Sequence, residues 1–434
     1  MKNGFIHLLS LEKKVLNYII FIVLMVLGIF FIPKINFVKS SGIKPFTIRI
    51  LFILKVLAGL AIGWLSFHFY KANDYWDLNK EGILEYKLLL KTPKEFISNI
   101  AYSPYQNKYG HFFSAVGSYW NDLRNNIIIK ILAICNLISH GNFYINALIF
   151  NIFGFLGCVA LYKVFIKAFP NKHWQTIVCA FLIPTTLYFT SGIHKDLIIF
   201  TSLSFYIYYL FELVNEEFKL KILIKFIIAL IIILLVRNFI LIPLIPFSLL
   251  YLVSRRLDFN PIKLFFSFIA VGLVLLVGLD LFSNLDFPFD LLVQRQADFL
   301  NLEPGQSQFE MAPLLPTLKS IVINLPNAFE HVFLRPYIWE DGNLFYIPAA
   351  IELLFFQGLL ILFLFFREKN DDYDWALIWL LVCFSMFMFI VIGLIIPNLG
   401  AVVRYKSIYL PFILLPLMCS IRWDKLIRLK RMMI

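Results

Sequence analysis

Residues 176–214 read TIVCAFLIPTTLYFTSGIHKDLIIFTSLSFYIYYLFELV, and this stretch decides the class of fold. Its two apolar runs are separated by Ser191-Gly192-Ile193-His194-Lys195-Asp196, which places a histidine, a lysine and an aspartate at one end of a membrane-length run. Hydrocarbon does not solvate ionised groups, so charges at such a place usually face a cavity, a lipid headgroup or a bound anion. The 191–196 segment is therefore the first candidate site.

The composition of the whole chain predicts a polytopic membrane protein. Hydrophobic residues make up 60% of the chain and charged residues only 15%, and the mean hydropathy is +0.81. The net charge of +12 does not indicate nucleic-acid binding, because the basic residues lie in short runs between apolar segments. The cysteines form no CxxC pair, and they indicate neither a disulfide framework nor a metal site: Cys135, Cys158, Cys179, Cys383 and Cys419.

Membrane-spanning helices need about 20 apolar residues each. On this basis we predict an all-α integral membrane protein with about 11 transmembrane helices, at 15–32, 50–70, 143–166, 176–190, 196–214, 222–236, 239–253, 262–281, 346–366, 375–396 and 407–421. Two long hydrophilic loops, 71–142 and 282–345, interrupt the series. Short apolar stretches inside them, such as 127–139, are predicted to lie along the membrane surface.

Lysine and arginine residues predict the orientation. The tail 422–434 is basic, and so are the loops 33–49, 167–175, 215–221 and 254–261, so all are assigned to the cytoplasm. This assignment puts both long loops, the 191–196 segment, Arg237-Asn238 and the 397–406 turn on the outer face of the cytoplasmic membrane. Lys2, Lys13 and Lys14 would then lie outside, unless the first apolar run returns as a hairpin. The expected parts are an N-terminal membrane segment with a basic loop, a transmembrane domain and a basic tail, at 1–49, 50–421 and 422–434.

Asp74 and Asp196 are the candidate catalytic residues. Asp74 follows the span 50–70 within about one helical turn, where a carboxylate is suited to act as a general base for a hydroxyl. A solvated loop acid or a helix N-cap is the alternative for a single acid. Asp196 opens a helix, where the helix dipole favours a negative charge. Lys195 gains nothing from that dipole, so we expect an anionic partner for it, either Asp196 or a phosphate.

Three further basic positions are candidates for anion binding. Arg237 interrupts the apolar run 222–253, so either two short helices meet there or one tilted helix carries a buried arginine. Arg404 and Lys406 are two residues apart at the start of a span, a spacing suited to clamping a phosphate.

The second long loop ends with Arg335-Pro336-Tyr337-Ile338-Trp339-Glu340-Asp341. Glu352 follows in the first turns of the next span, either as a cavity acid or as the partner of a cation. The chain contains no P-loop, Rossmann glycine signature, HExxH or Ser/His/Asp arrangement. We therefore expect no cofactor and leave a divalent metal open.

The order of these features resembles the C-type (GT-C) membrane glycosyltransferases, in particular the branch with the protein O-mannosyltransferases and the lipid A aminoarabinose transferases. The resemblance covers most of residues 50–421. In that family an early span delivers an acid into the first outer loop, as Asp74 does here, and an aspartate opens a later helix, as Asp196 does. Arg404-Tyr405 before Pro411 is similar to the family's C-terminal pattern. The family usually has two adjacent acids where Asn73 precedes Asp74, so Asp77 and Asp122 remain alternatives.

The resemblance implies transfer of a sugar from a polyprenyl-phosphate donor, held in the lipid bilayer, to a glycan, lipid or protein acceptor. It implies a substrate site built from His194, Lys195, Arg237, Arg335, Glu340, Arg404, Tyr405 and Lys406. One alternative is a polymerase or ligase that uses diphosphate-linked oligosaccharides. Another is a flippase or transporter of lipid-linked glycans, which the clustering of cations on one face disfavours.

Overall fold

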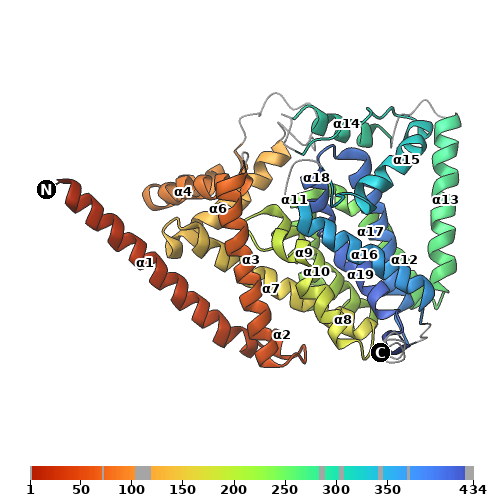
Figure 1. Ribbon diagram of the computed structural model, residues 1–434, viewed down its shortest axis with the longest axis horizontal. Coiled ribbons are helices and arrows are strands. Elements are labelled where there is room, and N and C mark those ends of the chain that lie inside the picture. Colours follow the sequence, from red (N-terminus) through yellow and green to blue (C-terminus); the bar gives the residue numbers. More distant parts are fainter. Residues whose placement is uncertain are drawn as a thin grey trace. The chain divides into compact units, whose positions relative to one another are not determined.

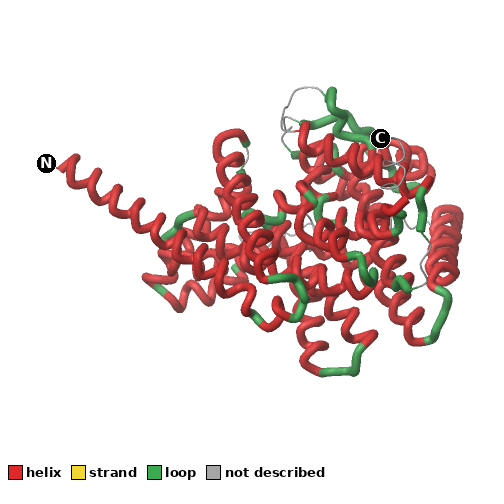
Figure 2. Tube along the Cα trace, turned by 60° about the horizontal axis from the view of Figure 1, so that its bottom comes forward, coloured by secondary structure: helices red, strands yellow, loops and turns green. Residues whose placement is uncertain are grey.

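The computed structural model describes residues 2–70, 73–102, 119–282, 289–302, 307–340, 346–368 and 372–425. These residues are almost entirely helical (Figures 1 and 2), and their extended pairings are two isolated β-bridges. The chain forms two compact units. Unit 1 comprises Met1–Ala160 and Leu187–Phe205, and unit 2 comprises Leu161–Thr186 and Tyr206–Ile434.

Eight helical segments of the described residues are long and apolar enough to cross a membrane, or nine if one bent pair is counted as a single span. The protein is therefore a helical, multi-pass membrane protein, as the composition predicted. The count of about 11 transmembrane helices is not confirmed. The count is lower because the stretch 176–190 is interrupted, the run 220–256 is counted as one segment, and 407–421 belongs to the bent pair.

Unit 1 is built on three apolar helices that carry two shorter polar ones. Its elements are α1 (Lys2–Phe31), η1 (Ile32–Lys34), α2 (Asn36–Lys39), α3 (Pro45–Phe69), α4 (Asp74–Lys91), α5 (Pro93–Ser98), η2 (Asn99–Ala101), α6 (Tyr119–Ser139), most of α7 (Phe143–Ala168), the end of α9 (Pro184–Phe189) and the first half of α10 (Lys195–Asn215). Glycines bring α3 and α7 close together, since a Cβ on Gly63 would lie 2.5 Å from the ring of Phe143.

The first long loop, 71–142, contains the helices α4 and α6. The side chain of Asn73 accepts a hydrogen bond from the backbone N–H of Trp76 (3.4 Å), which caps α4. Apolar residues recur along one face of α4, and Tyr75 and Leu78 are buried there with Leu132 of α6 in one core cluster. The loop is therefore packed onto unit 1, and its polar face carries Asp74.

Unit 2 contains the remaining helices. Its elements are the ends of α7 and α10, α8 (His173–Ile177), the π-helix η3 (Val178–Leu182), the start of α9, α11 (Leu220–Arg237), η4 (Asn238–Ile240), α12 (Leu241–Arg256), α13 (Pro261–Phe282), α14 (Phe289–Leu300), α15 (Leu318–Phe333), α16 (Ile347–Phe365), α17 (Trp375–Ile395), α18 (Leu399–Lys406) and α19 (Leu410–Cys419). The described parts of the second long loop are largely α14 and α15.

The predicted span 176–190 is not one helix. Ile183 is extended (φ −63°, ψ 118°) and separates the π-helix from α9. The cause is Pro184, because a proline disfavours the helical conformation of the residue before it. The span 407–421 also differs: α18 and α19 are bent by 60° around residues 407–409, and Pro411 lies in the first turn of the second helix.

The apolar run 220–256 folds back on itself at Arg237. The ring of Tyr206 lies 4.7 Å from that of Phe226, and the hydroxyl of Tyr206 donates to Ser248 (3.0 Å). A straight helix would separate Phe226 from Ser248 by about 33 Å. Of the two alternatives for Arg237, the structure therefore shows two helices that meet there, and excludes one tilted helix.

Unit 2 gathers its basic loops at one end. Lys167 contacts Glu212 and Glu216, Lys172 contacts Glu368, and Arg255 contacts Asp374, with charged atoms 2.8–3.6 Å apart. The loops 167–175, 215–221 and 254–261, predicted to face one side, thus lie together with residues 366–368 and 372–374. We call this the basic end. The opposite end carries Arg237 and α14, α15 and α18, which lie along the upper edge of unit 2 in Figure 1 while α8 lies at its lower edge.

Candidate functional site

Asp74 stands directly beyond the end of α3, and aromatic side chains fix the backbone around it. The indole N–H of Trp76 donates to the carbonyl of Gly63 (3.0 Å), and its ring stacks on Phe143 with 4.3 Å between centroids. The hydroxyls of Tyr70 and Tyr188 are 3.2 Å apart. The side chain of Asp74 is 61% exposed, so it is open to a substrate while its backbone is held.

A buried histidine connects Asp74 with Asp196. The Nε2 atom of His194 lies 3.7 Å from Oδ2 of Asp74, and its Nδ1 atom lies 2.9 Å from Oδ2 of Asp196. The ring of Tyr75 covers the imidazole at 4.8 Å. His194 is 3% exposed and Asp196 is fully buried, so only Asp74 of the three reaches the surface. The structure thus joins three of the predicted residues in one chain of polar contacts.

In each neutral tautomer His194 can donate to only one of the two aspartates, since its other ring nitrogen then carries a lone pair. With hydrogen on Nδ1, the ring donates to the carboxylate of Asp196, and the Nε2 lone pair faces Asp74. With hydrogen on Nε2, the ring faces Asp74 as a donor, and Nδ1 accepts the backbone N–H of Asp196 (3.2 Å). This arrangement suits proton exchange at Asp74. Because His194 and Asp196 are buried, they lie behind Asp74, and the catalytic role of Asp196 and the substrate-binding role of His194 stay predictions.

Lys195, the first residue of α10, interacts electrostatically with Glu81 of α4. Partial burial raises the pKa of Glu81, the nearby charge of Asp77 raises it further, and the charge of Lys195 counters the rise. The two alternatives for its anionic partner were Asp196 and a phosphate, and neither anticipated Glu81. Asp74, Asp77 and Glu81 follow one another at helical spacing, so Glu81 lies on the same face of α4 as the two acids of its first turn.

In unit 2 two guanidinium groups meet one tyrosine ring. Arg237 lies 4.4 Å and Arg404 lies 5.0 Å from the centroid of Tyr405. Arg404 also donates to the hydroxyl of Tyr405 (3.2 Å). We call these three residues the arginine–tyrosine cluster. Two like charges around one ring repel each other, which makes the place suitable for a bound anion.

Lys406 does not join this cluster. Its ammonium is buried and donates to the carbonyls of Val332 (3.0 Å) and Arg335 (3.4 Å), at the C-terminal end of α15. A cation there satisfies carbonyls that have no partner within the helix and complements the helix dipole. The structure therefore does not bring Arg404 and Lys406 together as a clamp. Arg404 contacts Tyr405, whereas Lys406 contacts the C-terminal end of α15.

Replacing Lys406 with methionine is expected to destabilise the protein by about 1–3 kcal/mol, because the buried carbonyl of Val332 and the partly buried carbonyl of Arg335 lose their donor. The measurement is thermal unfolding of the purified protein in detergent. Lys425→Met, which removes an exposed lysine near the C-terminal end, is the matched control and should leave the unfolding temperature unchanged. Equal unfolding temperatures for the Lys406 variant and the native protein would contradict the capping role.

Arg335 and Glu340 pair with each other. The Nε atom of Arg335 lies 3.1 Å from one carboxylate oxygen of Glu340 and 3.2 Å from the other. The backbone N–H of Tyr337 donates to the same carboxylate (3.1 Å). Both predicted substrate-binding residues thus close a short loop, whose rings of Tyr337 and Trp339 are stacked at 5.3 Å.

This loop is expected to open at low pH. The hydrogen bond from Arg335 lowers the pKa of Glu340, so the stability that the pair contributes is present at neutral pH and is lost as the pH falls through the lowered pKa, below the ordinary value of about 4.3. Hydrogen exchange of residues 335–340, corrected for intrinsic rates, should be constant near neutral pH and rise below about pH 4. In Glu340→Gln the corrected exchange should be fast and independent of pH. Unchanged protection of the native loop in acid would contradict this.

Glu352 was predicted to be a cavity acid or the partner of a cation. It is buried and accepts hydrogen bonds from the backbone N–H (2.7 Å) and the hydroxyl of Thr185. Thr185 is in the first turn of α9, so the carboxylate caps the helix that Pro184 starts. Its hydrogen bonds are thus with a helix end, and the positive charge of Lys406 also acts on it, as expected for the partner of a cation.

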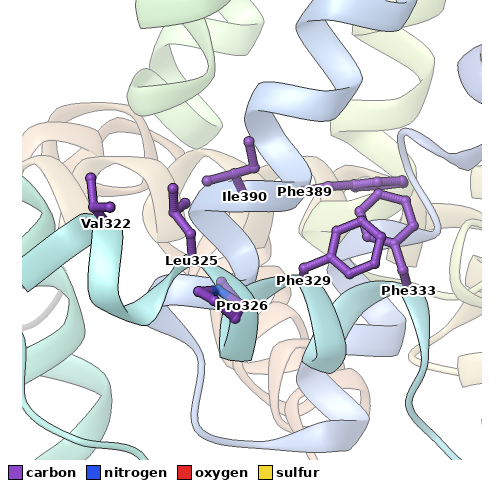
Figure 3. A pocket seen from close by; sticks show the side chains of 8 residues that line it. Val322, Leu325, Pro326, Phe329, Phe333, Phe389 and Ile390 are labelled. Carbon is purple, nitrogen blue, oxygen red and sulfur yellow. The ribbon is translucent and has the colours of Figure 1, made fainter. Parts of the chain in front are cut away.

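An apolar cavity of about 350 Å³ lies between α15 and α17. Figure 3 shows its lining, with Phe329 and Phe333 of α15 facing Phe389 of α17. All eight lining side chains are apolar: Val322, Leu325, Pro326, Ala328, Phe329, Phe333, Phe389 and Ile390. Through its bond to Val332, Lys406 connects α15 to α18, the helix that carries Arg404 and Tyr405.

No known protein resembles this chain closely enough to indicate its function. Comparisons with protein-family models, curated proteins and solved structures find no match. The likeness to the C-type membrane glycosyltransferases therefore stays a prediction. Among the described residues no group of three or more His, Cys, Asp or Glu side chains is arranged to hold a metal ion.

Proposed function

We propose that the protein is a membrane sugar transferase that uses a polyprenyl-phosphate donor. The observation that carries the proposal is the exposed carboxylate of Asp74 at the end of a membrane helix, with His194 and Asp196 buried behind it. A carboxylate in that place can accept a proton from a hydroxyl that arrives from water while the donor stays in the membrane.

The orientation supports the same proposal in each unit separately. In unit 1 the basic loop 33–49 lies at the start of α3 and Asp74 follows its end. In unit 2 the arginine–tyrosine cluster lies opposite the basic end. With the basic loops assigned to the cytoplasm, the proposal assigns both sets of residues to the outer side of the cytoplasmic membrane.

The arginine–tyrosine cluster is proposed to bind the donor phosphate. Guanidinium groups bind phosphate oxygens through paired hydrogen bonds, and Arg237 and Arg404 converge on Tyr405. The leaving group is a lipid phosphate, so these cations would stabilise the negative charge that grows on it in the transition state. The apolar cavity between α15 and α17 has the lining that a hydrocarbon chain requires.

In the proposed reaction the acceptor oxygen attacks the anomeric carbon of the sugar. A new carbon–oxygen bond forms as the bond between that carbon and the phosphate oxygen breaks. The electron pair leaves with the polyprenyl phosphate, and the acceptor proton goes to Asp74. A single displacement of this kind inverts the configuration at the anomeric carbon.

The test is the lipid-linked sugar that accumulates in cells without the protein. Cells that lack it, and cells that carry only Asp74→Asn or Arg404→Ala, should accumulate the same polyprenyl-phosphate sugar on the outer leaflet. Mass analysis of the lipid distinguishes the alternatives: a diphosphate-linked oligosaccharide would favour a polymerase or ligase. Accumulation on the inner leaflet alone would contradict transfer and favour a flippase.

A further inference from the structure

A lysine is buried inside the apolar helix α3 of unit 1. Lys55 is the eleventh of its 25 residues and is 1% exposed. Its ammonium donates to the carbonyl of Thr190 (2.8 Å), and it lies 3.3 Å from each of the hydroxyl oxygens of Thr190 and Ser191. An ammonium has three donors, and three oxygens receive them. No carboxylate of the described residues pairs with Lys55, so its attachments are to this one turn.

Other residues of unit 1 enclose the same turn. The side chain of Asn151 donates to the carbonyl of Ser191 (2.8 Å). Two glycines permit the approach: a Cβ on Gly59 would lie 2.5 Å from the carbonyl oxygen of Ser191, and one on Gly192 would lie 2.9 Å from the ring of Tyr75. The turn 190–192 is therefore held by polar bonds and by close packing where water cannot replace lost partners.

The turn precedes His194 by two residues. An ionisable group in the middle of a membrane helix is costly and usually functional, yet Lys55 reaches neither Asp74 nor the surface. We propose that Lys55 is a positioning residue, which fixes the turn 190–192 and thereby sets the imidazole of His194 between Asp74 and Asp196. Its function in catalysis rests on the proposed sugar transfer, whereas its control over His194 does not.

The first experiment measures the reactivity of His194 without any substrate. Diethyl pyrocarbonate modifies accessible imidazoles, and mass spectrometry locates the modified histidine. In the native protein His194 should react slowly, because it is 3% exposed. In Lys55→Met its rate should rise about tenfold or more, since the turn loses its donor. Lys163→Met, at another lysine of an apolar helix that contacts Tyr208 instead, is the matched control and should leave His194 slow.

The second experiment measures transfer kinetics. Lys55→Met should lower kcat about 10–100-fold with KM unchanged, because Lys55 contacts no substrate. The same change in a His194→Gln background should have no further effect, since both changes act through one imidazole. Additive losses would overturn the positioning role. If the native protein transfers no sugar, the proposed function fails, and the reactivity of His194 still decides the role of Lys55.

A milder variant covers the case in which Lys55→Met does not fold. The double change Thr190→Val and Ser191→Ala removes the two hydroxyl acceptors and keeps the lysine. It should raise the reactivity of His194 in the same direction by a smaller factor. Slow modification of His194 in the folded double variant, or in Lys55→Met where that variant folds, would overturn the proposal.

Discussion

Asp74→Asn should lower the rate of sugar transfer by about 10²–10⁴-fold, the usual contribution of a general base. The amide has nearly the same size but cannot take the acceptor proton. Folding should be unaffected, because the side chain is 61% exposed and the cap of α4 is made by Asn73. The measurement is transfer by the purified protein in liposomes, with thermal unfolding as the check on folding.

Asp77→Asn is the matched control for this variant. Asp77 is also exposed, is in the same first turn of α4 and pairs with Lys80 at 2.9 Å. An exposed pair of this kind contributes little to stability, so the variant should fold and transfer normally. Loss of activity in Asp77→Asn with full activity in Asp74→Asn would move the base to Asp77, one of the alternatives that the family's paired acids leave open.

Arg404→Ala should lower transfer by about 10²–10³-fold, the range seen when one donor to a developing anion is removed. Arg237→Ala should have a loss of the same kind, because its guanidinium lies on the same ring of Tyr405. Arg404→Lys should recover part of the rate, since it restores the charge without the planar pair of donors. The measurement is kcat and KM for the donor.

Arg422→Ala is the control for a general effect of positive charge. Arg422 is exposed beside Phe366 at the basic end, so its removal should leave both kinetic constants unchanged. A similar loss in Arg422→Ala and Arg404→Ala would contradict a specific phosphate site. Full activity in both Arg404→Ala and Arg237→Ala would remove the cluster from the mechanism.

The class of fold and the grouping of the loops follow from the sequence, because hydropathy and the placement of Lys and Arg act over long segments. The break at Pro184 was also visible, since a proline marks the residue before it as extended. The span prediction for 176–190 was wrong because apolar length was given more weight than this local signal.

The contacts of individual charged side chains were harder to predict. Lys406 and Arg404 are two residues apart and looked like one clamp, but whether a lysine meets a phosphate or the end of α15 depends on a helix about 70 residues earlier in the sequence. Lys55 was missed although its signal was present, since a lysine within an apolar span requires a partner. The partner lies 135 positions away and only the fold brings it close.

The hairpin of α11 and α12 is short for a membrane. Its 18 and 16 residues rise about 27 and 24 Å, against a hydrocarbon layer of about 30 Å. Such hydrophobic mismatch is relieved by thinning of the adjacent bilayer, which draws lipid headgroups inward toward the tip. Arg237 at that tip would then meet phosphates at a depth where neighbouring helices meet only acyl chains. The short hairpin would thereby make the membrane locally thinner around the arginine–tyrosine cluster.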